Sequence, residues 1–556
     1  MITKIKLKCG RSPNAPPTEL DATPVTVFVG PNNSGKSRVL RETERYCRTG
    51  QQDATDVLIE EIDFRGLSAQ QAAEAVERIT VSPDPAQSVA VGNVLVGSQR
   101  GRFEVPLTDL LRFMQTPTES LTAFCQWFLA HTTLILDGRG RINLVDQQGA
   151  GDLQKPAQSS FQVLLRNDSK RHEVRRIVHD AFASYFVIDP TNLGTLRIRL
   201  SPRAPANDME ERGIHAEAVD FHSRAQLIDE ASDGVKAFTG IITEIMAGDP
   251  QIILVDEPEA FLHPSLASKL GFEVSRAALV ADKRVLVSTH SPTFVMGCIQ
   301  SGAPVNIVRL TYRGGLATAR VLPSDDILEL MRHPLLRSTG VLNGLFYEFV
   351  IVTESDTDRV FYQEINERLL EFYPAWGIPN CLFINAQNKQ TIQTIIRPLR
   401  QLGIPAAGIV DVDILKDGGV AWTKLLTSAN IPGISHGPLA AMRAAVRQAM
   451  DATGHDMKRD GGVAILPDAD REAAENLLSQ MAEYGIFAVP GGELESWLRE
   501  LGIGGHGPAW LISMFERMGE DSRDAAYIKP SHADVWKFIG KVKSWLVDPN
   551  RKGIPA

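Results

Sequence analysis

The clearest pattern along the chain is a series of short, largely apolar runs, each followed by a turn and a stretch with helical periodicity. In the first half these runs occupy residues 25–29, 252–256, 284–288 and 305–310. Such runs, bounded by turn residues, are typical of strands buried on both faces of a parallel sheet. The alternation of strands and helices therefore predicts an α/β domain, with residues 317–321 as a further strand.

The same alternation starts again after a Pro-containing helical linker around residues 325–337. Further strands are predicted at residues 349–353, 381–384, 406–410 and 485–489. Strands that alternate with helices through short loops indicate a second parallel sheet. We therefore expect residues 1–340 to form one domain and residues 345–556 to form another.

The composition fits a soluble globular protein of 556 residues, with 43% apolar and 22% charged residues. No apolar run approaches the roughly 18 residues of a membrane span, so we expect a cytoplasmic protein without membrane association. The five cysteines are scattered and form no C-x-x-C motif, which argues against disulfides and a zinc site. A net charge of −9 does not exclude a nucleic-acid partner, because binding faces are local.

The strongest motif follows the first predicted strand and fits the phosphate-loop pattern G-x-x-x-x-G-K-[ST] without a mismatch. Its glycines allow backbone N–H groups to surround a phosphate, and the helix that follows adds a favourable field. Lys36 would reach the β- and γ-phosphates, and the Ser37 hydroxyl would ligate Mg²⁺. ATP and Mg²⁺ are therefore the predicted cofactors of this loop, bound by Gly30, Asn32, Asn33, Ser34, Gly35, Lys36 and Ser37.

Later strands end in residues that suit ATP hydrolysis. The run at 252–256 ends in Asp256 and is followed by Glu257. Asp256 would hold Mg²⁺ through its water shell, and Glu257 would orient or deprotonate the attacking water. The run at 284–288 would deliver His290 toward the γ-phosphate. Any one of these could be an ordinary strand end, but their order along the chain favours an ATPase.

A helix with Ser232 and Gly234 at its start precedes the Asp-Glu strand. The ordered set of motifs resembles the ABC-type ATPase heads of the RecF and SMC class. That resemblance implies a homodimer or higher homo-oligomer, in which ATP lies between two heads and the Ser-x-Gly helix of one contacts the nucleotide of the other. Ala231 replaces the usual Leu of this signature. Gln99 would correspond to the glutamine that senses Mg²⁺ and nucleotide.

Residues 105–220 carry few motifs, and we interpret them as an inserted dimerisation region of the ATPase. Residues 132–146, with a turn at 137–140, and residues 193–200 have the pattern of paired strands. Residues 166–182 form a basic helix that either touches nucleic acid or faces solvent or a dimer partner.

Carboxylates follow the strands of the second predicted sheet. Glu354 follows the first of them, and Asp411 and Asp413 follow the third. Because the carboxyl ends of parallel strands share one edge, these side chains can converge. Clustered carboxylates repel one another unless divalent cations neutralise them, and Mg²⁺ or Mn²⁺ prefers such oxygen ligands. The alternative is that each is an acid of a surface loop.

A Glu after the first strand and Asp-x-Asp after the third resemble the Toprim domain. The order of ABC-type ATPase and Toprim resembles the OLD (overcoming lysogenisation defect) family, which includes anti-phage nucleases. The match around the glutamate covers Glu354, Asp358, Arg359, Phe361 and Tyr362. The resemblance implies one metal at Glu354, Asp411 and Asp413. It implies a second metal at Asp358, Glu493 and Glu495.

Two further positions follow from this resemblance. Ser355 replaces the family's Gly, which would strain the turn if the backbone φ there were positive. Family members also use a late lysine to stabilise the transition state, and Lys529 is the first candidate, with Lys537 as the other.

The predicted function is that of an ATP-regulated, metal-dependent endonuclease or nickase that cuts DNA by a two-metal mechanism in anti-phage defence. One alternative is a RecF-like ATPase that binds nucleic acid or a partner without cleaving. Another is a Toprim nuclease that acts on RNA such as tRNA. A helicase or sensor protein is a possible further partner.

Overall fold

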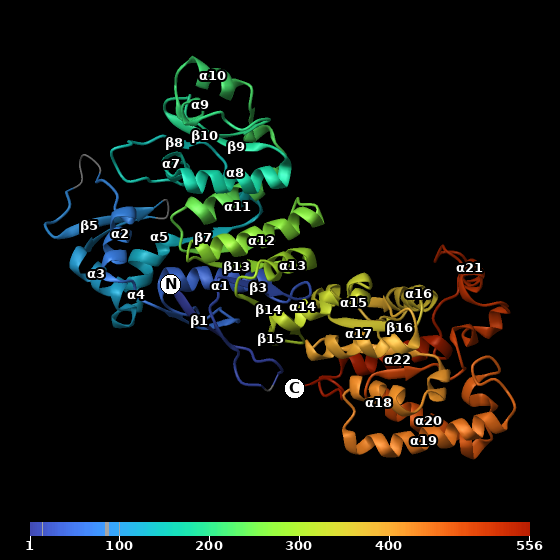
Figure 1. The fold of residues 1–556 in the computed structure, drawn as a ribbon. Helices are drawn as coiled ribbons and strands as arrows, with labels where there is room; N and C mark the ends of the chain where they lie inside the picture. Colours follow the sequence, from blue (N-terminus) through green and yellow to red (C-terminus); the bar gives the residue numbers. More distant parts are fainter. Residues whose placement is uncertain (14, 84–87, 99–100, 556) are drawn as a thin grey trace. The chain divides into compact units, whose positions relative to one another are not determined.

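The computed structural model describes residues 1–13, 15–83, 88–98 and 101–555. Contacts within the chain divide it into two compact units, Met1–Leu328 and Glu329–Ala556 (Figure 1). Gln99, the predicted nucleotide sensor, lies outside the described residues. Within the described ranges, no helix is both long and apolar enough to cross a lipid bilayer.

The first unit is built around a six-stranded mixed sheet with strand order β15-β14-β3-β13-β12-β7. Neighbouring strands are parallel except for β14 and β15, which form an antiparallel hairpin. The strands are β3 (Val25–Val29), β7 (Thr133–Leu136), β12 (Ile252–Asp256), β13 (Arg284–Ser288), β14 (Val305–Arg313) and β15 (Leu316–Leu322). The α/β architecture and the strands predicted from the apolar runs of this half are therefore confirmed.

Helices pack against this sheet because its strands are apolar on both faces. They include α1 (Lys36–Thr49), α11 (Asp233–Ala247), α12 (Pro264–Val280) and α13 (Pro292–Gln300). α1 packs against β7, β12 and β13, where Ile252 and Leu254 join Val39 and Leu40 in one hydrophobic core. α12 packs against both α11 and α13 in a further layer (Figure 1).

The first unit also contains an antiparallel sheet β2-β1-β4 and a β5-β6 hairpin. Their strands are β1 (Ile2–Leu7), β2 (Glu19–Asp21), β4 (Ile59–Phe64), β5 (Asn93–Ser98) and β6 (Gly101–Pro106). The accompanying helices are α2 (Ala69–Ile79), α3 (Leu107–Gln115), α4 (Leu121–Phe124) and α5 (Ala130–Thr132).

The prediction of paired strands at residues 132–146 is wrong. β7 lies at the edge of the main sheet and pairs in parallel with β12, so these residues belong to the ATPase sheet. The expected turn instead starts α6 (Gly138–Asn143), because the Asp137 side chain accepts a hydrogen bond from the Gly140 N–H at 2.7 Å. The strand predicted at 193–200 is confirmed as β10 (Thr195–Ser201), which pairs with β9 (Tyr185–Asp189), β8 (Gln148–Gly149) and β11 (Gln226–Leu227).

The basic stretch at 166–182 belongs to α7 (Ser160–Arg166) and α8 (Asp168–Phe182). Arg171 is fully buried and its guanidinium contacts Glu211 of α9 (Asp208–Arg212) at 3.1 Å. Arg175 contacts the same carboxylate and is mostly buried. These two side chains therefore hold α8 and α9 together and are largely buried between the two helices. α10 (Ala216–Ser223) completes this region.

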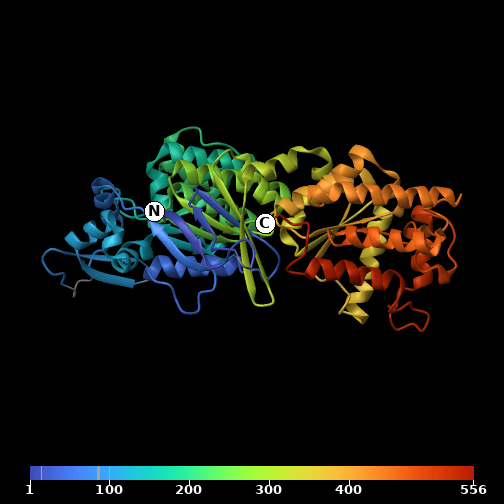
Figure 2. The ribbon, with the colours of Figure 1, turned by 90° about the horizontal axis from the view of Figure 1, so that it is seen from below.

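The second unit contains a four-stranded, fully parallel sheet with order β17-β16-β18-β19. Its strands are β16 (Phe349–Thr353), β17 (Cys381–Asn385), β18 (Ala406–Val410) and β19 (Ile486–Ala488), as predicted. Ala407 and Ile409 face a core shared with α16 and α22, whereas Gly408 faces Ile392 and Ile396 of α17. Helices therefore cover both faces of this sheet (Figure 2).

The helices of the second unit follow from the same alternation. They are α14 (Ser324–Arg332, at the boundary), α15 (Pro334–Ser338), α16 (Asp356–Phe372), α17 (Lys389–Gln401), α18 (Gly419–Ser428), α19 (Gly433–Ala452), α20 (Asp468–Ala482), α21 (Gly507–Met518) and α22 (Asp534–Val547). The predicted linker helix is thus split between α14 and α15 at Pro334, whose ring cannot continue a helix.

Candidate functional sites

The phosphate loop joins β3 to α1 through backbone conformations that favour glycine. Gly30 and Gly35 have φ values of 146° and 96°, and Asn33 has 61°. A Cβ atom on Gly30 would lie 2.1 Å from the Leu310 carbonyl oxygen, so only glycine fits there. The loop therefore presents backbone close to the start of α1, as a phosphate cradle requires.

The Lys36 side chain folds back over this loop. Its ammonium nitrogen donates to the carbonyl oxygens of Gly30 and Pro31 at 2.8 and 2.7 Å, and the residue is only 5% exposed. Burial lowers the pKa of Lys36 to about 8. The buried Lys36 ammonium can therefore exchange its hydrogen bonds to these neutral carbonyl oxygens for hydrogen bonds to phosphate oxygens.

Ser37 and Asp256 lie together, as their predicted roles at one Mg²⁺ require. The Ser37 hydroxyl donates to Asp256 Oδ1 at 2.9 Å, and the Ser288 hydroxyl donates to the same oxygen. Ser37 comes from α1 and Asp256 from the end of β12, so the fold joins residues separated by more than 200 positions. A hydroxyl beside a carboxylate provides the hard oxygen donors that suit Mg²⁺.

Glu257 and His290 extend the same edge of the sheet. Their side chains approach to 3.7 Å, between Glu257 Oε1 and His290 Nε2. Burial and the nearby Lys36 ammonium lower the pKa of His290, which favours the neutral imidazole. The Glu257 side chain is 51% exposed and is therefore accessible to a water nucleophile.

Two residues of this site have no signal in the local sequence. Arg141 of α6 is buried and donates to the backbone carbonyl of Asp256 at 2.6 Å and to that of Glu257. Glu259 Oε1 accepts from the His290 N–H at 2.8 Å. Both residues position the predicted catalytic groups through the backbone, and their contacts appear only once the chain is folded.

Ser232 and Gly234 lie at the start of α11, as predicted. Ser232 is exposed and its side chain makes no cap hydrogen bond to the helix. A Cβ atom on Gly234 would lie 2.6 Å from the Phe261 carbonyl oxygen, which explains the glycine. The exposed hydroxyl is compatible with a contact to a second head, and the sandwich dimer stays a prediction.

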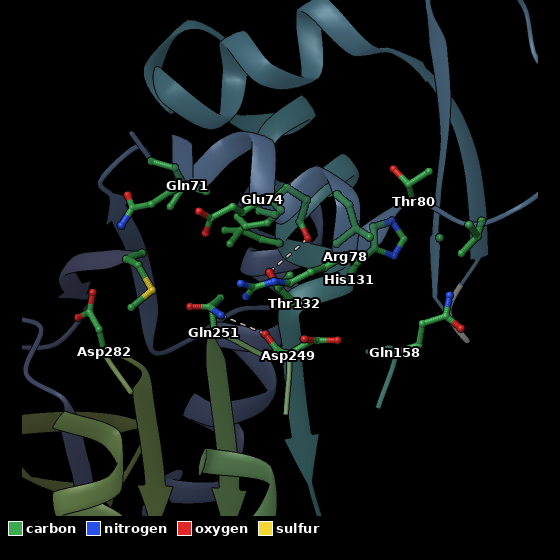
Figure 3. A pocket seen from close by; sticks show the side chains of 18 of the residues that line it. Gln71, Glu74, Arg78, Thr80, His131, Thr132, Gln158, Asp249, Gln251 and Asp282 are labelled. Carbon is green, nitrogen blue, oxygen red and sulfur yellow. Dashed lines mark hydrogen bonds between the residues drawn. The ribbon is translucent and has the colours of Figure 1, made fainter. Parts of the chain in front are cut away.

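A separate cavity of about 780 Å³ lies at the amino ends of the main-sheet strands, opposite the carboxyl ends that carry the phosphate loop. It is lined by residues that precede β12 and β13, such as Asp249, Gln251 and Asp282, whereas the phosphate loop follows β3 (Figure 3). Its charged lining includes both Arg78 and Glu74, so the cavity does not favour a ligand of either sign. It takes no part in the nucleotide site.

In the second unit the three predicted carboxylates do converge. One ligand oxygen from each of Glu354, Asp411 and Asp413 lies within 4.8 Å of the others. Glu354 follows β16 and Asp411 follows β18, and these neighbouring strands are parallel. Glu354 Oε1 also accepts from the Asp411 N–H at 2.9 Å, which fixes the two strand ends relative to each other.

The pKa values of these acids reflect their crowding. Burial and the neighbouring Asp411 raise the pKa of Glu354 to about 8. Burial and the same aspartate raise the pKa of Asp358 to about 6. Burial likewise raises the pKa of Asp411, although Lys458 opposes the shift. The cluster therefore resists carrying its full negative charge unless a cation is present.

The second predicted set lines the same cavity, which has a volume of about 590 Å³. Asp358 Oδ2 accepts from the Ser355 N–H at 2.8 Å in a capping box at the start of α16. Glu495 Oε1 accepts from the Gly507 N–H at 2.9 Å, and Glu493 lies two residues earlier. Ser355 has φ −130°, so the strain considered for this position is absent, and serine serves there as the helix cap.

Two lysines that sequence analysis missed lie in this cavity. The Lys458 ammonium nitrogen lies 2.7 Å from Asp411 Oδ2 and 3.9 Å from Glu493 Oε2. The Lys389 ammonium lies 3.1 Å from Asp413 Oδ2. Lys389 follows the end of β17, so the strand-end rule that identified Glu354 could have found it. Lys458 lies in a loop with no such signal.

The predicted late lysines lie elsewhere in the unit. Lys529 is exposed, with its ammonium 5.2 Å from the centre of the Phe372 ring. Lys537 is exposed on α22. Neither is among the described residues that line the acidic cavity, whereas Glu354, Asp358, Asp411, Asp413, Glu493 and Glu495 all line it.

The donor set of this cavity fits a hard divalent cation. Asp413 Oδ1 is buried and has no hydrogen-bond partner among the described residues, so one acceptor remains for a further ligand. Carboxylate oxygens are the ligands that Mg²⁺ and Mn²⁺ prefer. The residues present therefore suit the predicted metal chemistry.

Comparisons with known proteins bear on the first unit. Residues 157–296 match the family described as "AAA domain, putative AbiEii toxin, Type IV TA system". Together with the phosphate loop and the Ser37–Asp256 contact, this match identifies an ATPase domain of the AAA type in the first unit. No curated protein matches the chain.

Solved structures of SMC heads are similar to the chain. A head bound to the C-winged helix domain of ScpA has a TM-score of 0.32 and 13% identity, covering 59% of this chain and 99% of that one. The SMC head domain from Thermotoga maritima has a TM-score of 0.30 and 13% identity, and the match covers 58% of this chain and 99% of that one. A third structure is an SMC head with an extended coiled coil, derived from Pyrococcus furiosus and bound to the C-terminal domain of ScpA. It has a TM-score of 0.30 and 12% identity, and the match covers 60% of this chain and 98% of that one.

Proposed function

We propose that this protein is an ATP-regulated, metal-dependent endonuclease of the OLD family, with a Toprim nuclease domain in its second unit. Its substrate is DNA, which it nicks or cuts in anti-phage defence. The observation that carries the proposal is the convergence of Glu354, Asp411 and Asp413 at the carboxyl edge of a parallel sheet. A domain that only binds nucleic acid has no need to crowd three carboxylates in this way.

The six acids that line the cavity form two groups of three, one for each proposed metal ion. Glu354, Asp411 and Asp413 form the tighter group, and Asp358, Glu493 and Glu495 surround it. Two bound divalent cations would stabilise the attacking and leaving oxygens of a phosphodiester. Lys458 and Lys389 add positive charge on the Asp411 and Asp413 sides of the cavity, where a phosphate of the substrate must enter.

The ATPase unit has the parts for hydrolysis as well as for binding. Lys36 and the loop would hold the phosphates, Ser37 and Asp256 would hold Mg²⁺, and Glu257 and His290 would orient the water that attacks the γ-phosphate. We infer that ATP binding regulates the nuclease, with two heads assembling through the exposed Ser232 helix.

The main alternative is a RecF- or SMC-like ATPase that binds nucleic acid or a partner protein without cleaving. The AAA-type ATPase domain by itself fits that alternative equally well. A nuclease acting on RNA is a second alternative, because the acidic cavity suits either phosphodiester.

A cleavage assay separates these functions. Plasmid DNA and a structured RNA are incubated with Mg²⁺ or Mn²⁺ and with wild-type protein or Glu354→Ala. Metal-dependent cutting of DNA by the wild type alone supports the proposal. Cutting of RNA alone supports the second alternative, and the absence of cutting with both proteins supports the first.

A further inference from the structure

A groove between α17 and α18 has an unusual lining for so acidic a protein. It has a volume of about 650 Å³ and contains no carboxylate among its lining residues. Its two charged residues are Arg397 of α17 and Lys424 of α18, and both are exposed. The rest of the lining is uncharged and includes Gln393 of α17.

Arg397 and Lys424 carry the positive charge of this groove. Some lysines and arginines of the second unit are paired with acids, as Arg359 is with Asp356 and Lys416 with Asp456. Among the described residues, no ion-pair partner is found for Arg397 or Lys424. Their guanidinium and ammonium donors are thus available to an anion, and the Arg397 fork suits phosphate in particular.

The groove also connects to the acidic cavity along one helix. Lys389, Gln393 and Arg397 are spaced by four residues, so they form a row on one face of α17. Lys389 lies in the acidic cavity, and Gln393 and Arg397 lie in the groove. At 1.5 Å per residue the row spans about 12 Å, so its donors can contact successive phosphates along one strand.

We propose that the α17–α18 groove binds the phosphate backbone of a nucleic-acid strand and guides it to the acidic cavity. The inference rests on the proposed function for the position of the cutting site. Arg397 and Lys424 neutralise backbone phosphates, and Gln393 donates its amide N–H between them and Lys389. An extended row of donors suits a strand better than a single free phosphate, which would require donors that converge on one point.

Binding can be measured without cleavage, in EDTA, with fluorescent DNA and RNA oligonucleotides at several salt concentrations. We expect Arg397→Gln/Lys424→Gln to weaken binding by about tenfold or more. The slope of log K against log salt should fall by about 1.8, since each lost phosphate contact removes about 0.9. Lys541→Gln, an exposed lysine on α22, is the matched control and should bind as the wild type does.

Three outcomes would overturn the proposal. They are no binding of nucleic acid by the wild type, equal affinity and slope in the double variant, and complete competition by millimolar inorganic phosphate, which indicates a free-phosphate site. Circular dichroism checks the fold, and the milder single variants Arg397→Lys and Lys424→Arg should retain most of the binding. Binding that depends on the groove in a protein that never cleaves would support this inference while contradicting the nuclease proposal.

Discussion

The ammonium group of Lys458 lies 2.7 Å from Asp411 and 3.9 Å from Glu493, one acid from each of the two predicted metal-binding sets. It thus provides an internal cation between groups that would otherwise repel one another. A divalent metal entering this cavity must compete with that ammonium for the same carboxylate oxygens.

We therefore expect Lys458→Met to bind Mg²⁺ about tenfold more tightly than the wild type, since the internal competitor is gone. The metal-free variant should be less stable, because its carboxylates are no longer neutralised. Isothermal titration and the Mg²⁺-induced rise in Tm measure both effects. Lys541→Met is the control, and equal Mg²⁺ affinity in all three proteins would show that Lys458 does not compete.

Arg141 should matter for hydrolysis more than for binding. Arg141→Met removes the donor to the Asp256 and Glu257 carbonyls, which leaves the catalytic strand end less well positioned. We expect ATP affinity to change by less than about threefold and kcat to fall by about tenfold or more, a split that reports on transition-state geometry. Arg139 is an exposed arginine of the same helix, and Arg139→Met should leave both ATP affinity and kcat unchanged. A loss of affinity without a loss of kcat would contradict this role.

Lys36 should be needed for nucleotide binding and dispensable for the metal site. Lys36→Ala removes the buried ammonium that is positioned to contact the phosphates, so ATP affinity should fall by more than about tenfold, or about 1.4 kcal/mol. Mg²⁺ binding at the acidic cavity should be unchanged. Lys4→Ala, a surface lysine paired with Glu19, provides the comparison. Wild-type ATP affinity in Lys36→Ala would disprove the phosphate-loop assignment.

The metal-free protein should lose stability as the pH rises. Burial and Asp411 raise the pKa of Glu354 from 4.5 to about 8, so between these values the folded state holds a proton that the unfolded state releases. The free energy of unfolding in EDTA should accordingly fall as pH increases from about 4.5 to about 8. Glu354→Gln should flatten this profile in denaturant titrations. Parallel profiles for both proteins would show that Glu354 titrates normally.

The sequence was informative where chemistry is local. The phosphate loop at Gly30–Ser37 is contiguous, and Glu354 and Asp411 directly follow apolar runs, so their convergence follows from the rule for parallel strands. The sequence pattern predicted the wrong pairing partner for Thr133–Leu136. The partner of a strand is set by the fold of distant segments, and here it is β12.

The residues that sequence analysis missed are those defined by distant contacts. Arg141 meets Asp256 across more than 100 positions, and Lys458 meets Asp411 from a loop without regular structure. Lys529, the lysine that the family resemblance indicates, lies against Phe372 outside the cavity lining. A lysine carries no local signature that separates a catalytic role from a surface role.

Whether the acidic cavity cuts DNA with bound metal is tested most directly by the rate of plasmid nicking as a function of Mg²⁺ or Mn²⁺ for wild type, Glu354→Ala and Asp356→Asn. Asp356 is the matched control, since it is exposed, lies two residues after Glu354 and is not among the residues lining the cavity. We predict metal-dependent nicking that Glu354→Ala reduces by at least about a hundredfold and Asp356→Asn leaves unchanged. Equal nicking by the wild type and Glu354→Ala, or no nicking by either, would contradict the account.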